Sequence, residues 1–357
     1  MRDPLDNIKA QVRALRPYSL RFEAARIKLN QNENPWDTPC EIKRETFSRL
    51  ENRPWSRYPE FIASRLIGRL AEFSDWTAEG TLVGNGSNEL IQALLMVTVS
   101  SGKRVLINEP TFSLYRQVTT ILGGEIISVP LTPQLTYDVT AMKAAIESSK
   151  PDVIIICSPN NPTGCLIPKP DLVSLLEATS GLIAVDEAYF EFSGETVLPL
   201  IEEHSNLVVL RTFSKALAMA ALRVGYLLAT PKLAREIGKA LLPYNLNVFS
   251  QTAAEVAMEM FASKYKPLIN VILKERDRVF LELGRIRGLE PVSSRANFMV
   301  VRSAIDPRIV FDGLLQRGIL IRDVTAYPML KDYFRISIGS PEENDLLLDS
   351  LREILAA

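Results

Sequence analysis

Three short motifs of this sequence place polar, chemically useful side chains soon after apolar runs rich in β-branched residues. The first motif carries Asn161, the second carries Asp186 and Tyr189, and the third carries Lys215, with Arg223 soon after it. Runs of this kind are typical of buried strands, so these groups are expected at strand ends. An amine can form a Schiff base, a carboxylate can bind a protonated ring nitrogen, and donors can hold a ring oxygen and a phosphate. Pyridoxal 5′-phosphate (PLP) needs that set of groups, and we therefore expect it as the cofactor.

Lys215 is the candidate nucleophile because its neighbours are mostly apolar or small, whereas most lysines lie on solvated surfaces. A free lysine titrates near about 10.4, so an amine that reacts at neutral pH needs a lowered pKa or storage as an imine. Thr212, Ser214 and Arg223 fit the anchoring of a phosphate through two hydroxyls and a guanidinium. A structural salt bridge is the alternative role for Arg223.

A glycine-containing turn, Gly84-Asn85-Gly86-Ser87-Asn88-Glu89, follows one apolar run and opens a helical pattern. Glycines let backbone N–H groups approach an anion, and a helix N-terminus favours its negative charge. Ser87 or Asn88 could also cap that helix. Taken alone, this motif is better explained as a plain tight turn, and Asp186 alone would fit a helix cap. The phosphate-site interpretation depends on the complementary groups at the other strand ends.

The composition excludes several classes of function. The chain has 357 residues, of which 47% are hydrophobic, which is enough for one large domain with a core and a smaller one. Its 41 basic and 42 acidic residues give a net charge of −1, which argues against nucleic-acid and anionic-membrane partners. No apolar run is long enough to suggest a membrane span, and the N-terminus is too polar for a signal peptide.

Cysteine and histidine are scarce. The three cysteines, Cys40, Cys157 and Cys165, fit no disulfide framework or zinc pattern and are consistent with a reducing cytoplasm. The single histidine, His204, lies in a polar segment typical of a solvated loop. A Ser-His-Asp or Cys-His nucleophile is therefore not expected, nor is a histidine-rich zinc site. Acid–base chemistry must come from carboxylates, lysine, tyrosine or a cofactor.

Apolar runs alternate with helical patterns between about residues 80 and 230. The expected strands are 81–83, 105–107, 125–129, 153–157, 182–185 and 207–210, with helical patterns at 89–96, near Tyr115 and at 171–176. Near-continuous Val, Ile and Leu runs are typical of strands covered on both faces. The alternation predicts a mostly parallel α/β sheet flanked by helices, with the ligand at the carboxyl ends of its strands.

A smaller α+β unit is predicted after about residue 290. Strands are expected at 297–301 and 335–338, and helices at 307–317 and 342–355. Before it, a long helical pattern starts at Val248 and continues past Pro267 with a break. Near the N-terminus a short helical pattern ends at Pro17, and the polar segment 30–35 is turn-forming.

Taken together, the motifs resemble those of class I and II aminotransferases of PLP fold type I. The matching motifs are Asn160-Asn161-Pro162-Thr163-Gly164, Asp186-Glu187-Ala188-Tyr189, Ser214-Lys215-Ala216-Leu217-Ala218 and Leu222-Arg223-Val224-Gly225-Tyr226. Finer motifs resemble histidinol-phosphate aminotransferases, namely Asn32-Glu33-Asn34-Pro35, Arg57-Tyr58-Pro59, the turn at 84–89, Pro110-Thr111-Phe112, Pro243-Tyr244-Asn245-Leu246-Asn247 and Phe334-Arg335-Ile336-Ser337-Ile338-Gly339. The resemblance runs from about residue 10 to the end. It implies an N-terminal arm (1–30) associated with the small domain, a large PLP-binding α/β domain (31–250) and a small C-terminal α+β domain (251–357).

The resemblance also implies a role for each matching residue. Lys215 would hold PLP as a Schiff base and shuttle the proton, Asp186 would bind the pyridine nitrogen, and Asn161 and Tyr189 would bind the ring oxygen. Phe112 would stack on the ring; many relatives have a tyrosine there, so a hydroxyl contact is lost. The phosphate would be held by Ser87, Asn88, Thr212, Ser214 and Arg223, and by Tyr58 from the other subunit of a homodimer with shared active sites. Arg335, helped by Arg322 and Tyr18 and lying with Asn161, would receive the anionic group of the substrate.

The activity implied by the resemblance is amino transfer from L-histidinol phosphate to 2-oxoglutarate, in a cytoplasmic, ping-pong cycle of histidine biosynthesis. Threonine-phosphate decarboxylases and aromatic amino-acid aminotransferases share the cofactor site and are alternatives. Release of CO₂ would mark the first, and amino transfer from phenylalanine without histidinol-phosphate activity would mark the second. A catalytically inactive protein of this fold is a further alternative, against which the intact Lys215, Asp186 and Arg223 argue.

Overall fold

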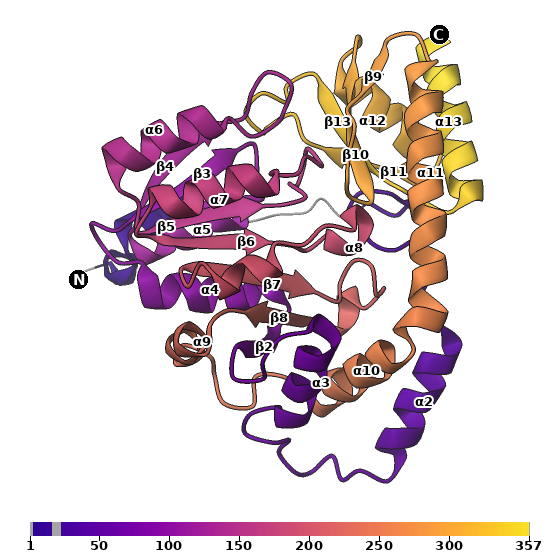
Figure 1. The fold of residues 1–357 in the computed structure, drawn as a ribbon. Coiled ribbons are helices and arrows are strands. Elements are labelled where there is room, and N and C mark those ends of the chain that lie inside the picture. The colour runs from indigo at the N-terminus through magenta and orange to yellow at the C-terminus, as the bar shows by residue number, and fades with distance from the viewer. Residues whose placement is uncertain (1–2, 16–22, 357) are drawn as a thin grey trace.

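The computed structural model describes residues 3–15 and 23–356, and at its centre lies a seven-stranded sheet with helices on both sides (Figure 1). The strands are β2 (Thr81–Asn85), β3 (Arg104–Glu109), β4 (Glu125–Pro130), β5 (Val153–Cys157), β6 (Leu182–Asp186), β7 (Leu207–Thr212) and β8 (Val224–Leu228). Their order is β2-β8-β7-β6-β5-β3-β4, and each neighbouring pair is parallel except the two that involve β8. The prediction of a mostly parallel α/β sheet is confirmed.

Alternate residues of the central strands face two different layers of helices. The covering helices are α4 (Ser87–Thr98), α5 (Leu114–Leu122), α6 (Val139–Ser149), α7 (Lys169–Ala178) and α9 (Pro231–Gly238). Val153 and Ile155 of β5 join a cluster with apolar residues of α4, α5 and α9. Ile154 and Ile156 of the same strand join the cluster that includes α6 and α7. An unbroken apolar run suits β5 because both of its faces are buried.

An antiparallel sheet with helices packed on it forms the smaller α+β part of the chain. Its strands lie in the order β12-β13-β10-β9 and are β9 (Leu289–Pro291), β10 (Phe298–Ser303), β12 (Arg322–Asp323) and β13 (Tyr333–Ser337). The helices are α11 (Lys266–Gly284), α12 (Pro307–Gln316) and α13 (Pro341–Ala356). The strands and helices predicted in this region are confirmed. The domain limits at residues 30 and 250 stay a prediction.

The predicted break in the long helical pattern lies just before Pro267. Helix α10 (Val248–Glu259) is followed by a π-helical stretch at Phe261–Tyr265, and α11 continues from Lys266. Pro267 lies in the first turn of α11, where its missing N–H costs no intrahelical hydrogen bond. Helices α2 (Cys40–Glu51) and α3 (Ser64–Ser74) pack against α10, and α11 runs from there along the side of the small sheet (Figure 1).

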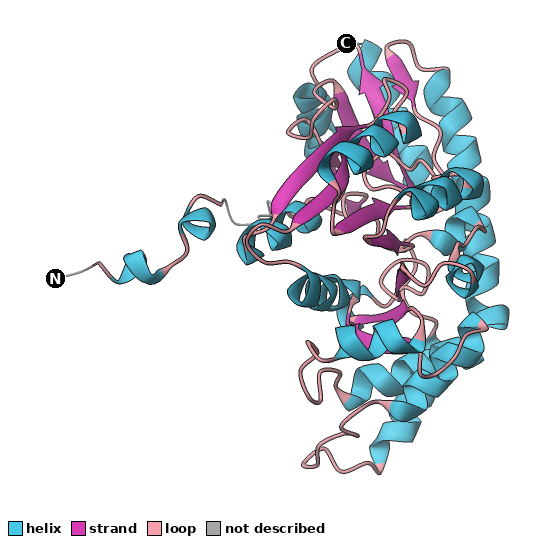
Figure 2. Cartoon of the chain, turned by 60° about the vertical axis from the view of Figure 1, so that its left-hand side comes forward, coloured by secondary structure: helices cyan, strands magenta, loops and turns pink. Residues whose placement is uncertain are grey.

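The N-terminal residues contact both parts of the molecule. Strand β1 (Ile27–Lys28) pairs in parallel with β11 (Ile319–Leu320), next to the small sheet. The predicted short helix is limited to α1 (Ala10–Arg13), which lies beside α5 of the large part. Lys9 Nζ donates to the carbonyl oxygen of Ile121 at 3.1 Å. The N-terminal helical turns extend away from the rest of the chain in Figure 2, whereas residues 27–30 contact the small part, since Ser337 and Arg335 bond the carbonyl oxygens of Leu29 and Asn30.

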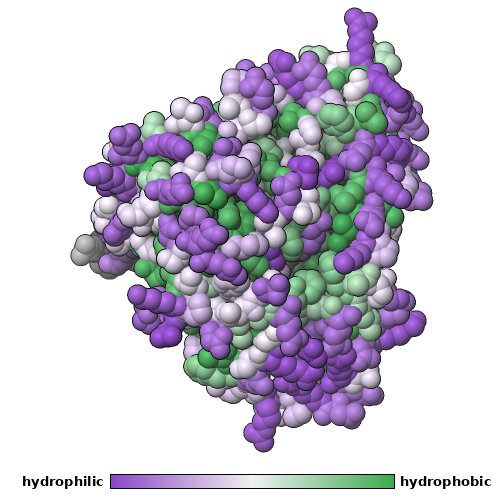
Figure 3. Space-filling view, viewed as in Figure 1, coloured by the Kyte–Doolittle hydropathy of each residue, from purple (hydrophilic) through white to green (hydrophobic). Residues whose placement is uncertain are grey.

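Hydrophilic side chains cover most of the face shown in Figure 3, with small groups of apolar residues between them. Within residues 3–15 and 23–356, no helix combines the length and apolar character that a bilayer span requires. The same residues contain no cluster of His, Cys, Asp and Glu that could hold a metal ion.

Candidate active site

The three motifs with polar side chains converge at one edge of the large sheet. Strands β5, β6 and β7 are adjacent and parallel, so their carboxyl ends meet at the same edge. Cys157 of β5 lies directly opposite Asp186, the last residue of β6. The loop with Asn161 leaves from the end of β5, and Lys215 follows Thr212, the last residue of β7. The structure thus brings the three motifs together at the carboxyl ends of the strands, which is the place that the sequence predicted for the ligand.

Asp186 is a buried carboxylate held by two donors. The hydroxyl of Tyr115 donates to Oδ2 at 2.6 Å, and the backbone N–H of Ala188 donates to Oδ1 at 3.1 Å. Burial raises the pKa of Asp186, whereas these two hydrogen bonds oppose that rise. Among the described residues no lysine, arginine or histidine forms an ion pair with it. A buried carboxylate without a cation is costly, so this site is suited to a positively charged N–H group.

Lys215 is half-buried in the loop after β7, and its amine bonds a main-chain carbonyl oxygen. Nζ donates to the carbonyl oxygen of Gln31 at 2.9 Å and lies 6.0 Å from the centre of the Tyr189 ring. Burial, assisted by the nearby positive charge of Arg335, lowers the pKa of Lys215 to about 8. The lowered pKa makes more of this amine neutral, and able to act as a nucleophile, near physiological pH than for a free lysine.

A tight arrangement of backbone and guanidinium lies at the N-terminus of α4. Gly86 precedes the helix with φ of 77°, and a Cβ atom at this position would lie 2.4 Å from Nη2 of Arg223. A Cβ at Gly225 would lie 2.3 Å from the backbone nitrogen of Ser87. Arg223 Nη1 donates to Ser214 Oγ at 3.2 Å. The close approach places a guanidinium, a hydroxyl and free helix N–H groups together, which favours an anion.

Thr212 and Asn88 have different relations to this anion site. Thr212 Oγ1 donates to Ser214 Oγ at 3.0 Å and accepts from the Ser214 backbone N–H at 3.1 Å, so it positions Ser214. Asn88 lies in the first turn of α4 with an exposed side chain, and its contribution can come from its backbone N–H.

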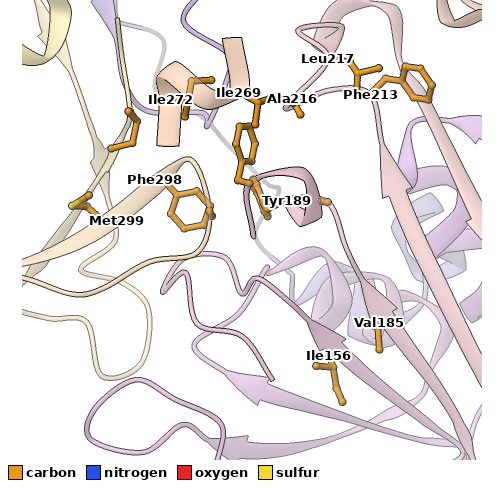
Figure 4. Packing of buried hydrophobic residues seen from close by; sticks show 14 of the residues in the cluster. Ile156, Val185, Tyr189, Phe213, Ala216, Leu217, Ile269, Ile272, Phe298 and Met299 are labelled. Carbon is orange, nitrogen blue, oxygen red and sulfur yellow. The ribbon is translucent and has the colours of Figure 1, made fainter. Parts of the chain in front are cut away.

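Aromatic and amide side chains surround the same edge of the sheet. Phe112 is half-buried and meets Tyr115 edge-on, with ring centres 5.6 Å apart. Tyr189 is buried beside Phe298 of the small sheet, with ring centres 5.0 Å apart, and the two rings are neighbours in Figure 4. Asn161 Oδ1 accepts from Nη1 of Arg335 at 2.6 Å. The site therefore lies between the large and the small sheet.

Two arginines oppose each other across strands β12 and β13. Arg322 pairs in register with Arg335, so their side chains leave the same face of the small sheet. Arg335 is buried, and its Nη2 donates to the carbonyl oxygen of Asn30 at 2.6 Å. Arg322 forms no ion pair with an acidic residue in the part of the chain that the structure describes. This arrangement concentrates positive charge beside Asn161.

Two of the predicted site residues stand apart. Tyr58 is 82% exposed and stacks on Tyr244, with ring centres 4.6 Å apart, and it has no hydrogen bond to another described residue. Tyr18 lies outside the described residues.

Three residues that contact the predicted groups were not among the predicted site residues. Tyr115 bonds Asp186, Gln31 accepts from Lys215, and Asn32 Nδ2 donates to the hydroxyl of Tyr189 at 3.0 Å. Tyr115 lies three positions after Phe112, but Phe112 precedes helix α5 (Leu114–Leu122), so helical spacing did not indicate its location. Asn32 opens the matching motif Asn32-Glu33-Asn34-Pro35, but neither its contact nor that of Gln31 could be predicted, because these contacts join segments far apart in the chain.

These groups fit PLP. A protonated pyridine nitrogen would supply the cation that Asp186 lacks, and the amine of Lys215 is suited to a Schiff base. The N-terminus of α4, with Ser214 and Arg223, offers donors for a phosphate dianion. The crowding at Gly86 and Gly225 agrees with this, because it keeps backbone N–H groups and guanidinium close enough to share one anion.

The family model described as aminotransferase class I and II matches residues 25–351. The chain therefore belongs to the class I and II aminotransferases, which are PLP-dependent transaminases. Its relatives include the histidinol-phosphate aminotransferases of Chlorobium phaeovibrioides, 38% identical over 355 residues, and Chlorobaculum parvum, 39% identical over 329 residues. The first alignment covers 99% of this chain and 98% of the relative, and the second covers 92% of each.

Solved structures show the same architecture. The histidinol-phosphate aminotransferase of Clostridium acetobutylicum matches with a TM-score of 0.86 and 25% identity, covering 92% of this chain and 99% of that one. The L-threonine-O-3-phosphate decarboxylase of Porphyromonas gingivalis matches with a TM-score of 0.81 and 23% identity, covering 93% and 100%. Because the second likeness concerns the fold alone, the substrate has to be argued from the residues of the site.

Proposed function

We propose that this aminotransferase moves the amino group of L-histidinol phosphate to 2-oxoglutarate, forming imidazole-acetol phosphate and L-glutamate in histidine biosynthesis. The observation that carries the proposal is the cross-strand pair of Arg322 and Arg335. Like charges at opposed positions of a sheet repel each other, and an anion between them removes that cost. The names of the relatives at 38% and 39% identity support the same activity.

One arginine pocket suits both substrates. Histidinol phosphate carries a phosphate monoester where an amino acid carries its carboxylate, and a guanidinium binds either anion through two parallel hydrogen bonds. Asn161 Oδ1 and the Asn30 carbonyl hold Nη1 and Nη2 of Arg335, which fixes the plane of its guanidinium before any substrate arrives. A preorganised receptor loses less conformational entropy on binding.

The residues at the strand ends divide the chemistry between them. PLP, when bound, supplies a protonated ring that accepts the electron pair of the substrate carbon. Asp186 keeps the ring nitrogen protonated, and the Tyr115 hydroxyl keeps that carboxylate in place. Lys215 would take the proton from the substrate carbon and deliver it to the cofactor carbon, and its lowered pKa suits this exchange near neutral pH. Tyr189 and Asn161 bind the ring oxygen.

The cofactor is held by groups around the N-terminus of α4. Backbone N–H groups of Ser87 and Asn88, the Ser214 hydroxyl and the Arg223 guanidinium bind its phosphate, with Thr212 positioning Ser214. Phe112 packs on the ring face, where it provides stacking without a hydroxyl.

A spectroscopic half-reaction tests the substrate directly. The PLP-loaded protein is mixed in single turnovers with L-histidinol phosphate, O-phospho-L-threonine, L-phenylalanine or L-glutamate, and both the loss of the PLP absorbance and CO₂ release are followed. We expect histidinol phosphate and glutamate to convert the cofactor to its amino form without CO₂. Release of CO₂ from phosphothreonine would instead identify a decarboxylase. Conversion by phenylalanine with no reaction of histidinol phosphate would identify an aromatic aminotransferase.

We also propose a homodimer in which Tyr58 reaches the phosphate site of the other subunit. Trp55, Phe61, Ile62 and Leu242 are 78%, 62%, 59% and 72% exposed, and all lie near Tyr58 in the sequence or near its stacking partner Tyr244. So many exposed large apolar side chains are typical of an interaction surface. Burying them against a second copy would also give the Tyr58 hydroxyl a partner.

We further propose that the enzyme works in the cytoplasm. All three cysteines are free, and Cys157 is buried beside the site, which suits a reducing compartment.

A further inference from the structure

Three consecutive residues at the N-terminal side of the site contact three functional side chains. Arg335 donates to the carbonyl of Asn30 at 2.6 Å, Lys215 donates to the carbonyl of Gln31 at 2.9 Å, and Asn32 donates to Tyr189 at 3.0 Å. The first two contacts use main-chain oxygen and do not depend on side-chain type. The third uses the amide of Asn32, which is 1% exposed, so this contact depends on the residue itself.

Ser337 fixes the orientation of the Asn32 amide. The backbone N–H of Asn32 donates to Ser337 Oγ at 2.9 Å, so this hydroxyl oxygen acts as an acceptor there. The single hydroxyl hydrogen of Ser337 is then free to donate to Asn32 Oδ1, which lies 3.1 Å away. The carbonyl half of the amide therefore faces Ser337, and the NH₂ half must face Tyr189.

The orientation of this amide decides what the hydroxyl of Tyr189 can do. An NH₂ group can only donate, so the Tyr189 oxygen accepts from Asn32 and its own hydrogen points elsewhere. Burial raises the pKa of Tyr189, which keeps the phenol protonated. Its hydrogen is therefore available to an acceptor in the site, such as the ring oxygen of PLP.

The backbone around Asn32 holds this arrangement in place. Asn32 has φ of 56°, a left-handed conformation that asparagine, aspartate and glycine tolerate better than other residues. Asn297 Nδ2 donates to the Asn32 carbonyl at 3.1 Å. Ser337 and Arg335 are two positions apart on β13, so they share a face of that strand. Asn32 thus connects the strand that carries the anion-binding arginine to the Tyr189 hydroxyl.

We propose that Asn32 is a positioning residue that directs the hydroxyl hydrogen of Tyr189 toward the cofactor and ties it to strand β13. This inference rests on the role proposed above for Tyr189 as a donor to the ring oxygen. Replacing the NH₂ group by an acceptor would reverse the hydrogen bond, because the phenol would then donate to residue 32 and not to the cofactor.

The test compares Asn32→Asp with Asn32→Gly in the PLP-loaded protein. Both residues tolerate the left-handed backbone, so the variants differ mainly at the contact with Tyr189. The readout is the pH midpoint at which the visible absorbance band changes. A donor to the ring oxygen stabilises the deprotonated form of the coloured group and lowers that midpoint. We expect Asn32→Asp to raise it by about one pH unit or more, and Asn32→Gly to raise it much less, since Tyr189 keeps its hydrogen for the cofactor.

The added negative charge of aspartate could raise the midpoint by itself, and a double-mutant cycle with Tyr189→Phe separates the two causes. If Asn32 acts through Tyr189, Asn32→Asp should add little in the Tyr189→Phe background. An equal shift in both backgrounds would overturn the proposal. Ser337→Ala, which releases the amide, should give a smaller shift in the same direction, and no shift there would also count against it. A wild-type protein that binds no PLP, and therefore shows no visible band, would contradict the proposed function itself.

Discussion

The hydroxyl of Tyr115 donates to Oδ2 of Asp186 at 2.6 Å, and both groups are buried beneath the carboxyl ends of β5 and β6. Of the two hydrogen bonds that Asp186 accepts, the one from this phenol is the shorter. Asp186 is the carboxylate that is proposed to face the cofactor nitrogen. A hydrogen bond to a buried carboxylate stabilises its charged form. The ionisation of Asp186 therefore depends on a residue that does not touch the substrate.

We predict that Tyr115→Phe moves the acidic limb of the kcat/KM profile to higher pH. Loss of the donor raises the pKa of Asp186, so the carboxylate is neutralised at a higher pH as the pH falls. Affinity for PLP should fall by roughly 1–3 kcal/mol, as for a hydrogen bond to a charged group. The measurements are a pH–rate profile and a PLP titration of the cofactor-free protein.

Tyr137→Phe is the matched control for that experiment. Tyr137 is also buried, but its hydroxyl bonds the main-chain oxygen of Cys157 and not a carboxylate. Tyr137→Phe should lower the free energy of unfolding about as much as Tyr115→Phe does, and it should leave the acidic limb of the kcat/KM profile in place. If the two variants shifted the limb equally, the effect of Tyr115 would be general loosening of the core.

The lowered pKa of Lys215 predicts how the stability of the cofactor-free protein depends on pH. The lysine titrates at about 8 in the folded protein and near about 10.4 when unfolded. Between these values the unfolded chain binds more protons, so this lysine makes the free energy of unfolding rise with pH. Denaturant titrations at about pH 7 and about pH 10 should show the wild type gaining stability relative to Lys215→Met. A constant difference would mean that the lysine is not perturbed.

The proposed dimer predicts complementation between two inactive variants. Lys215→Ala lacks the amine and Tyr58→Ala lacks the phenol that is proposed to reach the other subunit. A mixed dimer would contain one complete site, so equal mixing should restore roughly a quarter of wild-type sites. Sedimentation should show a dimer for each variant. An active wild-type monomer would rule the shared site out.

The large sheet was predictable from sequence because β5, β6 and β7 are apolar on both faces and read as unbroken runs. Strand β8 was not recognised, although its residues are equally buried. It follows Arg223, which has a left-handed φ of 54°, and it runs antiparallel to both of its neighbours. An alternation of strands and helices predicts parallel crossovers, and it gives no signal for a strand that returns directly.

The groups at the strand ends were predictable for a related reason, because parallel strands bring their carboxyl ends together. The location of Lys215, Asp186 and Asn161 could therefore be predicted without knowing any other contact. Asn32 lay in a segment interpreted as a polar turn and as part of a motif resembling histidinol-phosphate aminotransferases, with no role assigned to the residue itself. Its contacts with Tyr189 and Ser337 span 157 and 305 positions, and local sequence patterns contain no information about such separations.

Arg335, with Arg322, is proposed to receive the anionic group of both substrates. Lysine keeps the charge but cannot form the two parallel hydrogen bonds of a guanidinium. Arg335→Lys should therefore weaken both half-reactions while the PLP spectrum stays nearly unchanged, because Ser214 and Arg223 lie elsewhere. Arg302→Lys serves as the control, since Arg302 belongs to the same sheet but is exposed and paired with Glu290.

The most direct measurement is kcat/KM of Arg335→Lys for L-histidinol phosphate and for L-glutamate, each in its own half-reaction. We predict that both fall, by roughly 1–3 kcal/mol of transition-state binding, while Arg302→Lys matches the wild type. A loss confined to one substrate would show that the two anions use different pockets. Wild-type values for both would show that Arg335 does not bind the substrate.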